Sequence, residues 1–157
     1  MPRLIFDIET VGNDFDSLDD KSKEFVTKFA ETPEEEQEAK DGLSFSPLTA
    51  KVVAIGILNP DTDKGAVYFY DPSGKLEKES KNNIQYNPLE SEKEVLKEFR
   101  ETAHLYDHFV TFNGRGFDCP FLIVRSAVHK IKPTKNLMPN RYESGDYGKI
   151  ITHVDLL

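Results

Sequence analysis

The sequence contains a single cysteine, Cys119, and no tryptophan among its 157 residues. One thiol cannot form an internal disulfide, so we expect a protein of the reducing cytoplasm. The longest uninterrupted apolar run covers residues 52–58, far short of the roughly 20 residues that span a bilayer. The long apolar stretch of a signal peptide is also missing, because Asp7 interrupts the first ten residues. These absences argue against a membrane protein and against a disulfide-stabilised secreted domain.

An excess of positive charge is missing too. The chain has 28 Asp and Glu against 20 Lys and Arg, a net charge of −8. The balance is −8 in residues 1–50, −3 in residues 51–119 and +3 in residues 120–157. An acidic protein does not coat nucleic acid through bulk charge. An enzyme that holds one nucleic-acid end through metal ions and a local basic rim remains compatible with this balance.

Hydrophobic periodicity predicts one α/β domain over residues 1–157. We expect strands over 3–8, 51–58, 65–71, 109–112 and 150–157, and a polar loop over 71–88. We expect helices over 17–30, 33–42, 91–108 and 119–130. The order β-β-β-α-β-α-β predicts a mixed five-stranded sheet, an antiparallel meander followed by parallel strands, flanked by helices. Residues 17–42 read as a helical insertion between the first two strands.

The first motif of interest is FDIET, residues 6–10, at the end of the first predicted strand. It places two carboxylates, Asp7 and Glu9, in a segment that otherwise reads as a buried strand. Burying a carboxylate is costly unless the group is paired, hydrogen-bonded or bound to metal. Residues i and i+2 of a strand project from the same face, roughly 6.5 Å apart. The motif therefore predicts two carboxylates that act together.

The second motif is TFNGRGFDCPFL, residues 111–122, in which Asp118 stands just before a helix opened by Pro120. Asp is a favoured helix N-cap, so this segment taken alone needs no catalytic explanation. If the strand over 109–112 lies beside the first strand, however, Asp118 converges with Asp7 and Glu9. Three converging carboxylates repel one another, and hard oxygen ligands favour Mg²⁺ or Mn²⁺. We therefore expect two divalent metal ions of the kind that catalyse phosphoryl transfer.

With this spacing and strand order, the two motifs resemble the DEDD superfamily of 3′–5′ exonucleases, which has the ribonuclease H-like fold. FDIET followed by Asn113-x-x-x-Phe117-Asp118-x-Pro120 is most similar to the proofreading exonuclease domain of family-B DNA polymerases and its stand-alone bacterial relatives. The resemblance implies that Asp7 bridges both metals, Glu9 binds the nucleophile-side metal and orients its water, and Asp118 binds the second metal. The implied reaction is hydrolysis of the 3′-terminal phosphodiester, which releases nucleoside 5′-monophosphates.

The resemblance also implies substrate contacts. Asn113 would place the strand end near the scissile phosphate, and Phe117 would pack under the site or against a base. We add Thr10 and Arg115 to the expected substrate-binding residues. Other basic residues could line the nucleic-acid path, with solvated surface charge as the alternative; they are Arg125, Lys130, Lys132 and Lys135.

The family also has a third motif, a Tyr or His followed by a fourth carboxylate, on a helix beyond the last strand. We expect this helix to follow Leu157, so that the C-terminal helices are missing and the domain is truncated. His153 and Asp155 share one strand face, but their spacing is wrong for the third motif, and we assign them to strand packing or to support of the site residues. His104 and His108 read as surface histidines rather than a metal pair, and Cys119 as a buried thiol.

The sequence thus predicts a metal-dependent exonuclease acting on single-stranded 3′ ends, with reduced or no activity in this chain. DNA is favoured over RNA as the substrate, and an oligoribonuclease-like RNA exonuclease is one alternative. The other is a non-catalytic ribonuclease H-like module that binds nucleic acid or regulates. The oligomeric state stays open.

Overall fold

The computed structural model describes residues 2–139 and 151–157. Its strands are β1 Arg3–Gly12, β2 Ala50–Asn59, β3 Lys64–Tyr70, β4 Glu79–Lys81, β5 Ile84–Leu89, β6 His108–Thr111 and β7 Thr152–Asp155. Its α-helices are α1 Asp20–Thr27, α2 Pro33–Asp41, α3 Glu92–Ala103 and α4 Asp118–Val128. Two 3₁₀ turns, η1 Phe15–Ser17 and η2 Gly42–Phe45, flank the first pair of helices. None of the helices in these ranges is long and apolar enough to cross a membrane.

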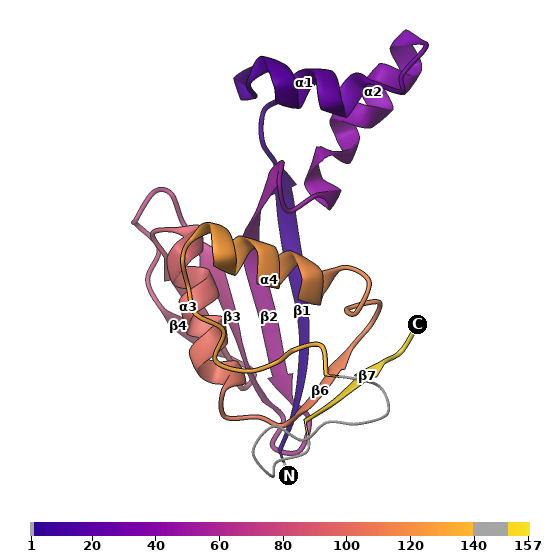
Figure 1. Cartoon of the computed structure of the whole chain (residues 1–157). Helices are drawn as coiled ribbons and strands as arrows, with labels where there is room; N and C mark the ends of the chain where they lie inside the picture. Colours follow the sequence, from indigo (N-terminus) through magenta and orange to yellow (C-terminus); the bar gives the residue numbers. More distant parts are fainter. Residues whose placement is uncertain (1, 140–150) are drawn as a thin grey trace.

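The strands form one mixed sheet in the order β4-β5-β3-β2-β1-β6-β7 (Figure 1). β1, β2 and β3 make the expected antiparallel meander, and β6 and β7 follow in parallel beside β1. The α/β class, with a mixed sheet flanked by helices, is confirmed. The expected count of five strands is wrong, because the described residues form seven.

The two additional strands, β4 and β5, lie within residues 71–88, which the sequence suggested was a polar loop. Asn82 and Asn83 connect them with φ values of 50° and 63°, the left-handed backbone of a two-residue hairpin turn. Asn tolerates this conformation better than most residues, because its short amide hydrogen-bonds locally. β5 then pairs in parallel with β3 despite containing Pro88. The Asn82–Asn83 pair is the feature of the sequence that indicates this hairpin.

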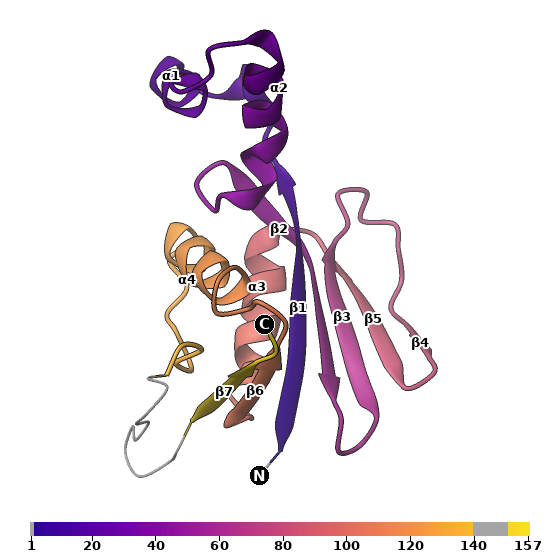
Figure 2. The same ribbon diagram turned by 90° about the vertical axis from the view of Figure 1, so that its right-hand side faces the viewer.

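Side-chain alternation in β1 sets the core. Leu4, Phe6 and Ile8 are buried and face α3 and α4, which both cover the same side of the sheet (Figure 2). Phe6 makes ring contacts with Phe99 of α3 and Phe109 of β6, with centroids 5.2 and 6.0 Å apart. The odd-numbered positions of β1 therefore point to the opposite side of the sheet, away from these helices.

The helical insertion projects from one end of the sheet (Figure 1). Asp19 caps α1 and Thr32 caps α2, so the helix expected to begin at Ser17 begins three residues later. No residue of either helix is buried, and the rings of Phe25 and Phe29 are 69% and 83% exposed. Within the described chain, the apolar side chains of α1 therefore pack against no core.

A buried carboxylate, Glu92, connects the two core helices to the sheet. Its oxygens accept two hydrogen bonds from Arg125 of α4 (2.8 and 2.6 Å), one from His129 (2.6 Å) and one from the Val52 N–H (2.8 Å). Burial alone would raise the pKa of Glu92, but the hydrogen bonds from Arg125 and His129 hold that pKa below its ordinary value. Arg125 also donates to the Pro47 carbonyl, which connects α4 to the end of the insertion.

Replacing Glu92 by glutamine should destabilise the protein by about 3–5 kcal/mol, because Arg125 would keep a largely buried charge without its partner. Chemical denaturation at neutral pH measures the change. The matched control is Glu36→Gln, which breaks a surface i,i+4 ion pair with Lys40 and should cost about 0.5 kcal/mol or less. Equal losses in the two variants would contradict the structural role of Glu92.

Candidate active site

β1 presents Asp7 and Glu9 on the face of the sheet that α3 and α4 leave open. Both side chains are exposed, so the expectation that this strand buries them is wrong. Their neighbours on β2 are small: Asp7 pairs with Gly56 and Glu9 with Ala54. The register of the two strands shifts directly after Glu9, and such an irregularity re-aims nearby side chains. The open face thus offers room around both carboxylates.

The second motif forms a tight turn between β6 and α4. Asn113 has a φ of 56°, and its carbonyl accepts hydrogen bonds from the N–H groups of Gly116 and Phe117. A Cβ at Gly114 would lie 2.3 Å from Thr111 Oγ1, and one at Gly116 would lie 2.5 Å from Asn113 Oδ1. Gly114 has no room for a Cβ, because three atoms of Thr111 lie too close, whereas at Gly116 the close atom is the end of the flexible Asn113 side chain. The turn is compact enough to begin α4 directly beside the end of β6.

Asp118 is the first residue of α4 and not its N-cap, which is Phe117. Its Oδ1 accepts a hydrogen bond of 3.0 Å from the backbone N–H of Ile8 in β1. Burial, together with repulsion from the neighbouring Asp7 carboxylate, raises the pKa of Asp118 to about 6. The structure therefore brings Asp7 and Asp118, which are far apart in the sequence, into direct electrostatic contact.

These carboxylates fit a cation only in part. Asp7 and Asp118 form an adjacent pair whose mutual repulsion a divalent cation would relieve. Glu9 lies two residues along the same strand face, but no hydrogen bond or ion pair from residues 2–139 and 151–157 fixes its carboxylate. Within those residues, no group of three His, Cys, Asp or Glu side chains is placed to hold a metal ion. A cation would be held by Asp7 and Asp118, and Glu9 would complete a set of three only by turning toward them.

The expected substrate-binding residues lie around this pair, and three of them have structural contacts. Thr10 Oγ1 donates to the Ser44 carbonyl at 2.8 Å, and Phe117 packs against Phe121 with ring centroids 5.3 Å apart. Arg115 donates through its guanidinium to the Pro139 carbonyl at 3.0 Å. Asn113 is exposed at the turn.

His153 and Asp155 belong to the framework behind the site. His153 Nδ1 donates to the Leu137 carbonyl (2.8 Å), and its Nε2 accepts from the Thr111 hydroxyl (2.7 Å). Burial lowers the pKa of His153, which favours this neutral form. Asp155 accepts a hydrogen bond from the Arg115 N–H at 2.9 Å, so it helps to hold the turn of the second motif. These contacts agree with the packing role expected for both residues.

The remaining candidates make no reactive cluster. Cys119 is fully buried, and burial raises the pKa of its thiol to about 12, as fits an unreactive core residue. α3 ends at Ala103, so His104 and His108 do not share a helix. His104 contacts the Thr134 carbonyl instead.

The sequence holds one further candidate for the third motif. A Tyr-x-x-x-Asp spacing does occur after Asp118, at Tyr142 and Asp146, although it precedes β7 and not a later helix. Both residues lie outside the described residues. Direct variants of this pair therefore belong in any test of catalysis.

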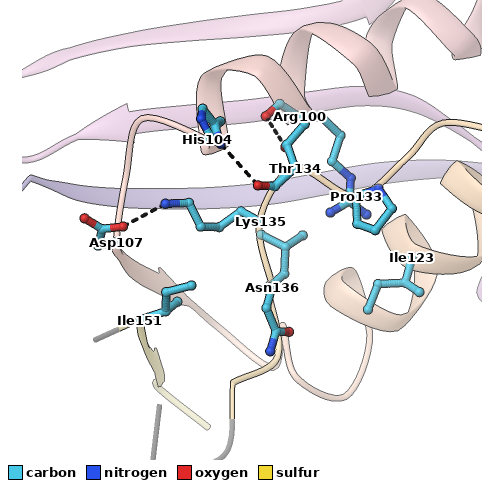
Figure 3. Close-up of a pocket in the computed structure, with 10 residues that line it drawn as sticks. Arg100, His104, Asp107, Ile123, Pro133, Thr134, Lys135, Asn136 and Ile151 are labelled. Carbon is cyan, nitrogen blue, oxygen red and sulfur yellow. Dashed lines mark hydrogen bonds and ion pairs between the residues drawn. The ribbon is translucent and has the colours of Figure 1, made fainter. Parts of the chain in front are cut away.

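A cavity of about 700 Å³ lies next to α3 and α4 and does not include the carboxylate pair. Arg100, His104, Lys135 and Ile151 are among its lining residues (Figure 3). The polar groups drawn there contact one another: Lys135 pairs with Asp107 at 2.7 Å, and Thr134 donates to the Arg100 carbonyl. These contacts connect the segment after α4 to α3. The polar groups that line the cavity thus serve packing of that segment.

Comparison with known protein families gives one match, over residues 45–153, to a family described as a predicted 3′–5′ exonuclease related to the exonuclease domain of PolB. The chain belongs to this family. The match covers more than half of the sequence, including Asp118 and its turn, whereas Asp7 and Glu9 precede it. The suspected relationship to the family-B exonuclease domain is confirmed. A search of curated proteins gave no match.

Among solved structures, the chain is similar to the family B DNA polymerase from the hyperthermophilic archaeon Pyrobaculum calidifontis. The TM-score is 0.51 at 16% sequence identity, over 99% of this chain and 15% of the polymerase chain. At this identity the likeness shows the fold alone. This chain therefore has the fold of a region that makes up a small part of the polymerase.

In chelator-treated protein at pH 7.5, Asp118→Asn should melt above wild type. The wild-type protein must ionise a carboxyl group whose native pKa, about 6, exceeds its ordinary value of 3.8. Such a group binds its proton more tightly in the folded state, so its ionisation lowers stability as pH rises from about 4 to about 6. Asparagine keeps an oxygen for the Ile8 N–H without the charge.

The gain in melting temperature should therefore shrink between pH 7.5 and pH 4, as measured by differential scanning fluorimetry. Glu24→Gln, on the exposed surface of α1, is the control and should show no such trend. A variant that melts below wild type at pH 7.5 would contradict the repulsion between Asp7 and Asp118.

Proposed function

We propose that this protein is a metal-dependent 3′–5′ exonuclease that hydrolyses phosphodiester bonds at single-stranded 3′ ends. The observation that carries the proposal is the contact between the Asp7 and Asp118 carboxylates, which the Ile8 N–H supports from β1. Among the described residues no basic side chain pairs with them, and two neighbouring acids without such a partner destabilise a fold unless they serve a ligand. The family supports the reaction class, because it is described as a predicted 3′–5′ exonuclease.

In this proposal Asp7 and Asp118 would hold the cation, and Glu9 on the exposed face of β1 would join them as a third ligand. Bound Mg²⁺ or Mn²⁺, as one ion or two, would supply charge stabilisation for the attacking and departing oxygens of the phosphodiester. Glu9 would orient the attacking water by accepting its hydrogen bond. The exposed Asn113 would contact the strand end at the turn beside Asp118.

Turnover by this chain is proposed to be low. The described residues supply three of the four carboxylates that the family resemblance implies, and none of them supplies the expected Tyr or His. A positioned general base typically contributes a factor of about 10² to 10⁴. DNA is the proposed substrate ahead of RNA, and the two are to be tested in parallel.

One observation favours a second candidate, a nucleic-acid-binding module without turnover. Among residues 2–139 and 151–157, no three acidic or other ligating side chains are grouped for a metal. A domain that keeps Asp7 and Asp118 for structural reasons alone would show this geometry. Metal binding and hydrolysis therefore need separate tests.

Millimolar Mn²⁺ should raise the melting temperature of the wild-type protein, because a ligand that binds only the folded state stabilises it by mass action. At ten times the dissociation constant the gain is about 1.4 kcal/mol. Asp7→Asn should abolish the shift, whereas Glu24→Gln on α1 should keep it. A shift that survives in Asp7→Asn would place the metal elsewhere.

With Mn²⁺ and a 5′-labelled single strand, wild-type protein should shorten the substrate stepwise from its 3′ end, slowly and without endonucleolytic products. Asp118→Ala should stop the reaction. Tyr142→Phe and Asp146→Asn test whether the chain's own Tyr-x-x-x-Asp pair takes part. Absence of hydrolysis on DNA and RNA, together with a Mn²⁺ shift and strand binding, would support the non-catalytic module.

A further inference from the structure

An acidic protein that acts on a polyanion needs a source of affinity other than bulk charge. The chain has a net charge of −8, and residues 14–41 alone contain 11 acidic and 4 basic side chains. Three basic residues expected along a nucleic-acid path are engaged internally. Arg115 donates to Pro139, Arg125 pairs with Glu92, and Lys135 pairs with Asp107. Stacking of unpaired bases on aromatic rings supplies affinity that does not depend on charge.

Phe45 is an exposed aromatic residue whose ring contacts the second motif and whose segment is hydrogen-bonded to the first. Phe45 is the last residue of η2 and is 73% exposed, although its ring is large and apolar. Its only ring partner in the described chain is Phe117, with centroids 6.4 Å apart in an edge-on arrangement. Phe117 directly precedes Asp118. One edge of the Phe45 ring is therefore supported by the second motif, while most of the ring remains open to solvent.

The backbone that carries Phe45 is fixed to β1 and to its own turn. Thr10, the residue after Glu9, donates its hydroxyl to the Ser44 carbonyl at 2.8 Å. The Ser46 N–H and the Thr49 hydroxyl both donate to the Leu43 carbonyl, at 3.4 and 2.8 Å. Rigid presentation matters, because a ring that is already ordered loses little entropy when a ligand stacks on it.

Three other phenylalanine rings are strongly exposed, and they are placed differently. Phe112, which is 65% exposed, follows β6 within the second motif, but no ring contact from the described residues supports it. Phe25 lies on α1 and Phe29 in the turn after it, and the Lys28 ammonium group lies over both rings, 5.3 and 4.3 Å from their centroids. They make no ring contact with a residue of either motif. Phe45 is therefore the exposed aromatic that combines a rigid backbone with contact to the site.

We propose that Phe45 is a stacking platform for one unpaired base near the 3′ end of the substrate. This inference rests on the exonuclease function proposed above and adds a base-binding subsite to it. Only an unpaired base can offer its face to a ring in this way, since both faces of a base inside a duplex are covered by its neighbours. Phe45 thereby favours a single strand over a duplex. Thr10 acts as a positioning residue, because it holds the backbone next to this ring.

The test measures binding of 5′-labelled 12-nucleotide oligothymidylate and oligouridylate to the full chain by fluorescence anisotropy, in chelator so that no hydrolysis occurs. Phe45→Ala should bind about 5- to 150-fold more weakly than wild type, the range expected for one stacked base. Phe45→Trp should restore binding, whereas Phe45→Leu, which keeps apolar contact with Phe117, should not. The slope of log affinity against log salt should stay unchanged, since no phosphate contact is lost.

A scan with single abasic sites identifies the base. In wild type, one abasic position near the 3′ end should weaken binding as much as Phe45→Ala does, and in Phe45→Ala that position should cost nothing further. Phe29→Ala is the matched control, because its ring is 83% exposed in the turn between α1 and α2 and its loss should leave affinity unchanged. Melting temperatures of all variants verify folding.

Two failures are distinguishable. If wild type binds a single strand, and Phe45→Ala binds as tightly with the same abasic profile, the stacking platform is wrong and the proposed function stands. If wild type binds neither of the two oligonucleotides, whether in chelator or in Mn²⁺, the proposed function fails and the stacking platform fails with it. A Phe45→Ala variant that loses affinity equally at every abasic position would also overturn the platform, because its effect would then not belong to one base.

Discussion

The hydrogen bond from the Ile8 N–H to the Asp118 carboxylate joins two segments 110 residues apart, and the candidate site depends on it. β6 pairs with β1 only as far as Ile5 and Val110, so the Ile8 N–H has no partner from that strand. A buried N–H without an acceptor is costly, and Asp118 supplies the acceptor. The same bond places a carboxylate beside Asp7. Asp118 therefore both accepts the hydrogen bond of a buried backbone N–H and supplies a carboxylate to the candidate site.

This arrangement has an electrostatic cost that other parts of the fold offset. Asp118 ionises against burial and against the Asp7 charge, which raises its pKa to about 6. The start of α4 nevertheless stays in place, because Arg125 of the same helix pairs with buried Glu92 of α3 and with the Pro47 carbonyl. In the proposed function, a bound divalent cation would relieve this repulsion between the two carboxylates.

The distribution of charge and of aromatic rings narrows the ways in which a nucleic acid can approach. Residues 14–41 hold most of the net negative charge, and they project from the end of the sheet toward which β1 runs. Phosphates are repelled there, while bases are not. Phe45, at the base of the projecting helices and in contact with Phe117, lies where a base can stack while its backbone stays away from the acidic helices.

The sequence by itself determined the α/β class, the antiparallel start of the sheet, the family and the two carboxylate motifs. These follow from local patterns: strand alternation in residues 3–8, the Gly-x-Gly turn before Asp118, and the spacing of Asp7 and Glu9. Local patterns could not show that Asp7 and Glu9 are exposed, because the exposed face of β1 is defined by helices more than 80 residues away. They also missed β4 and β5, whose Asn82–Asn83 turn resembles a polar loop until β5 finds β3.

Only the tertiary structure decided which side chains meet. It paired Asp7 with Asp118 and left Glu9 apart, assigned Arg125 to Glu92, and gave Thr10 a structural bond to Ser44. It also exposed Phe45 beside Phe117, which no periodicity predicts. The physical reason is that side-chain neighbours across a sheet depend on where each strand stops and on how each helix settles onto it. Those outcomes are set by packing of the whole core and not by the residues of the motifs.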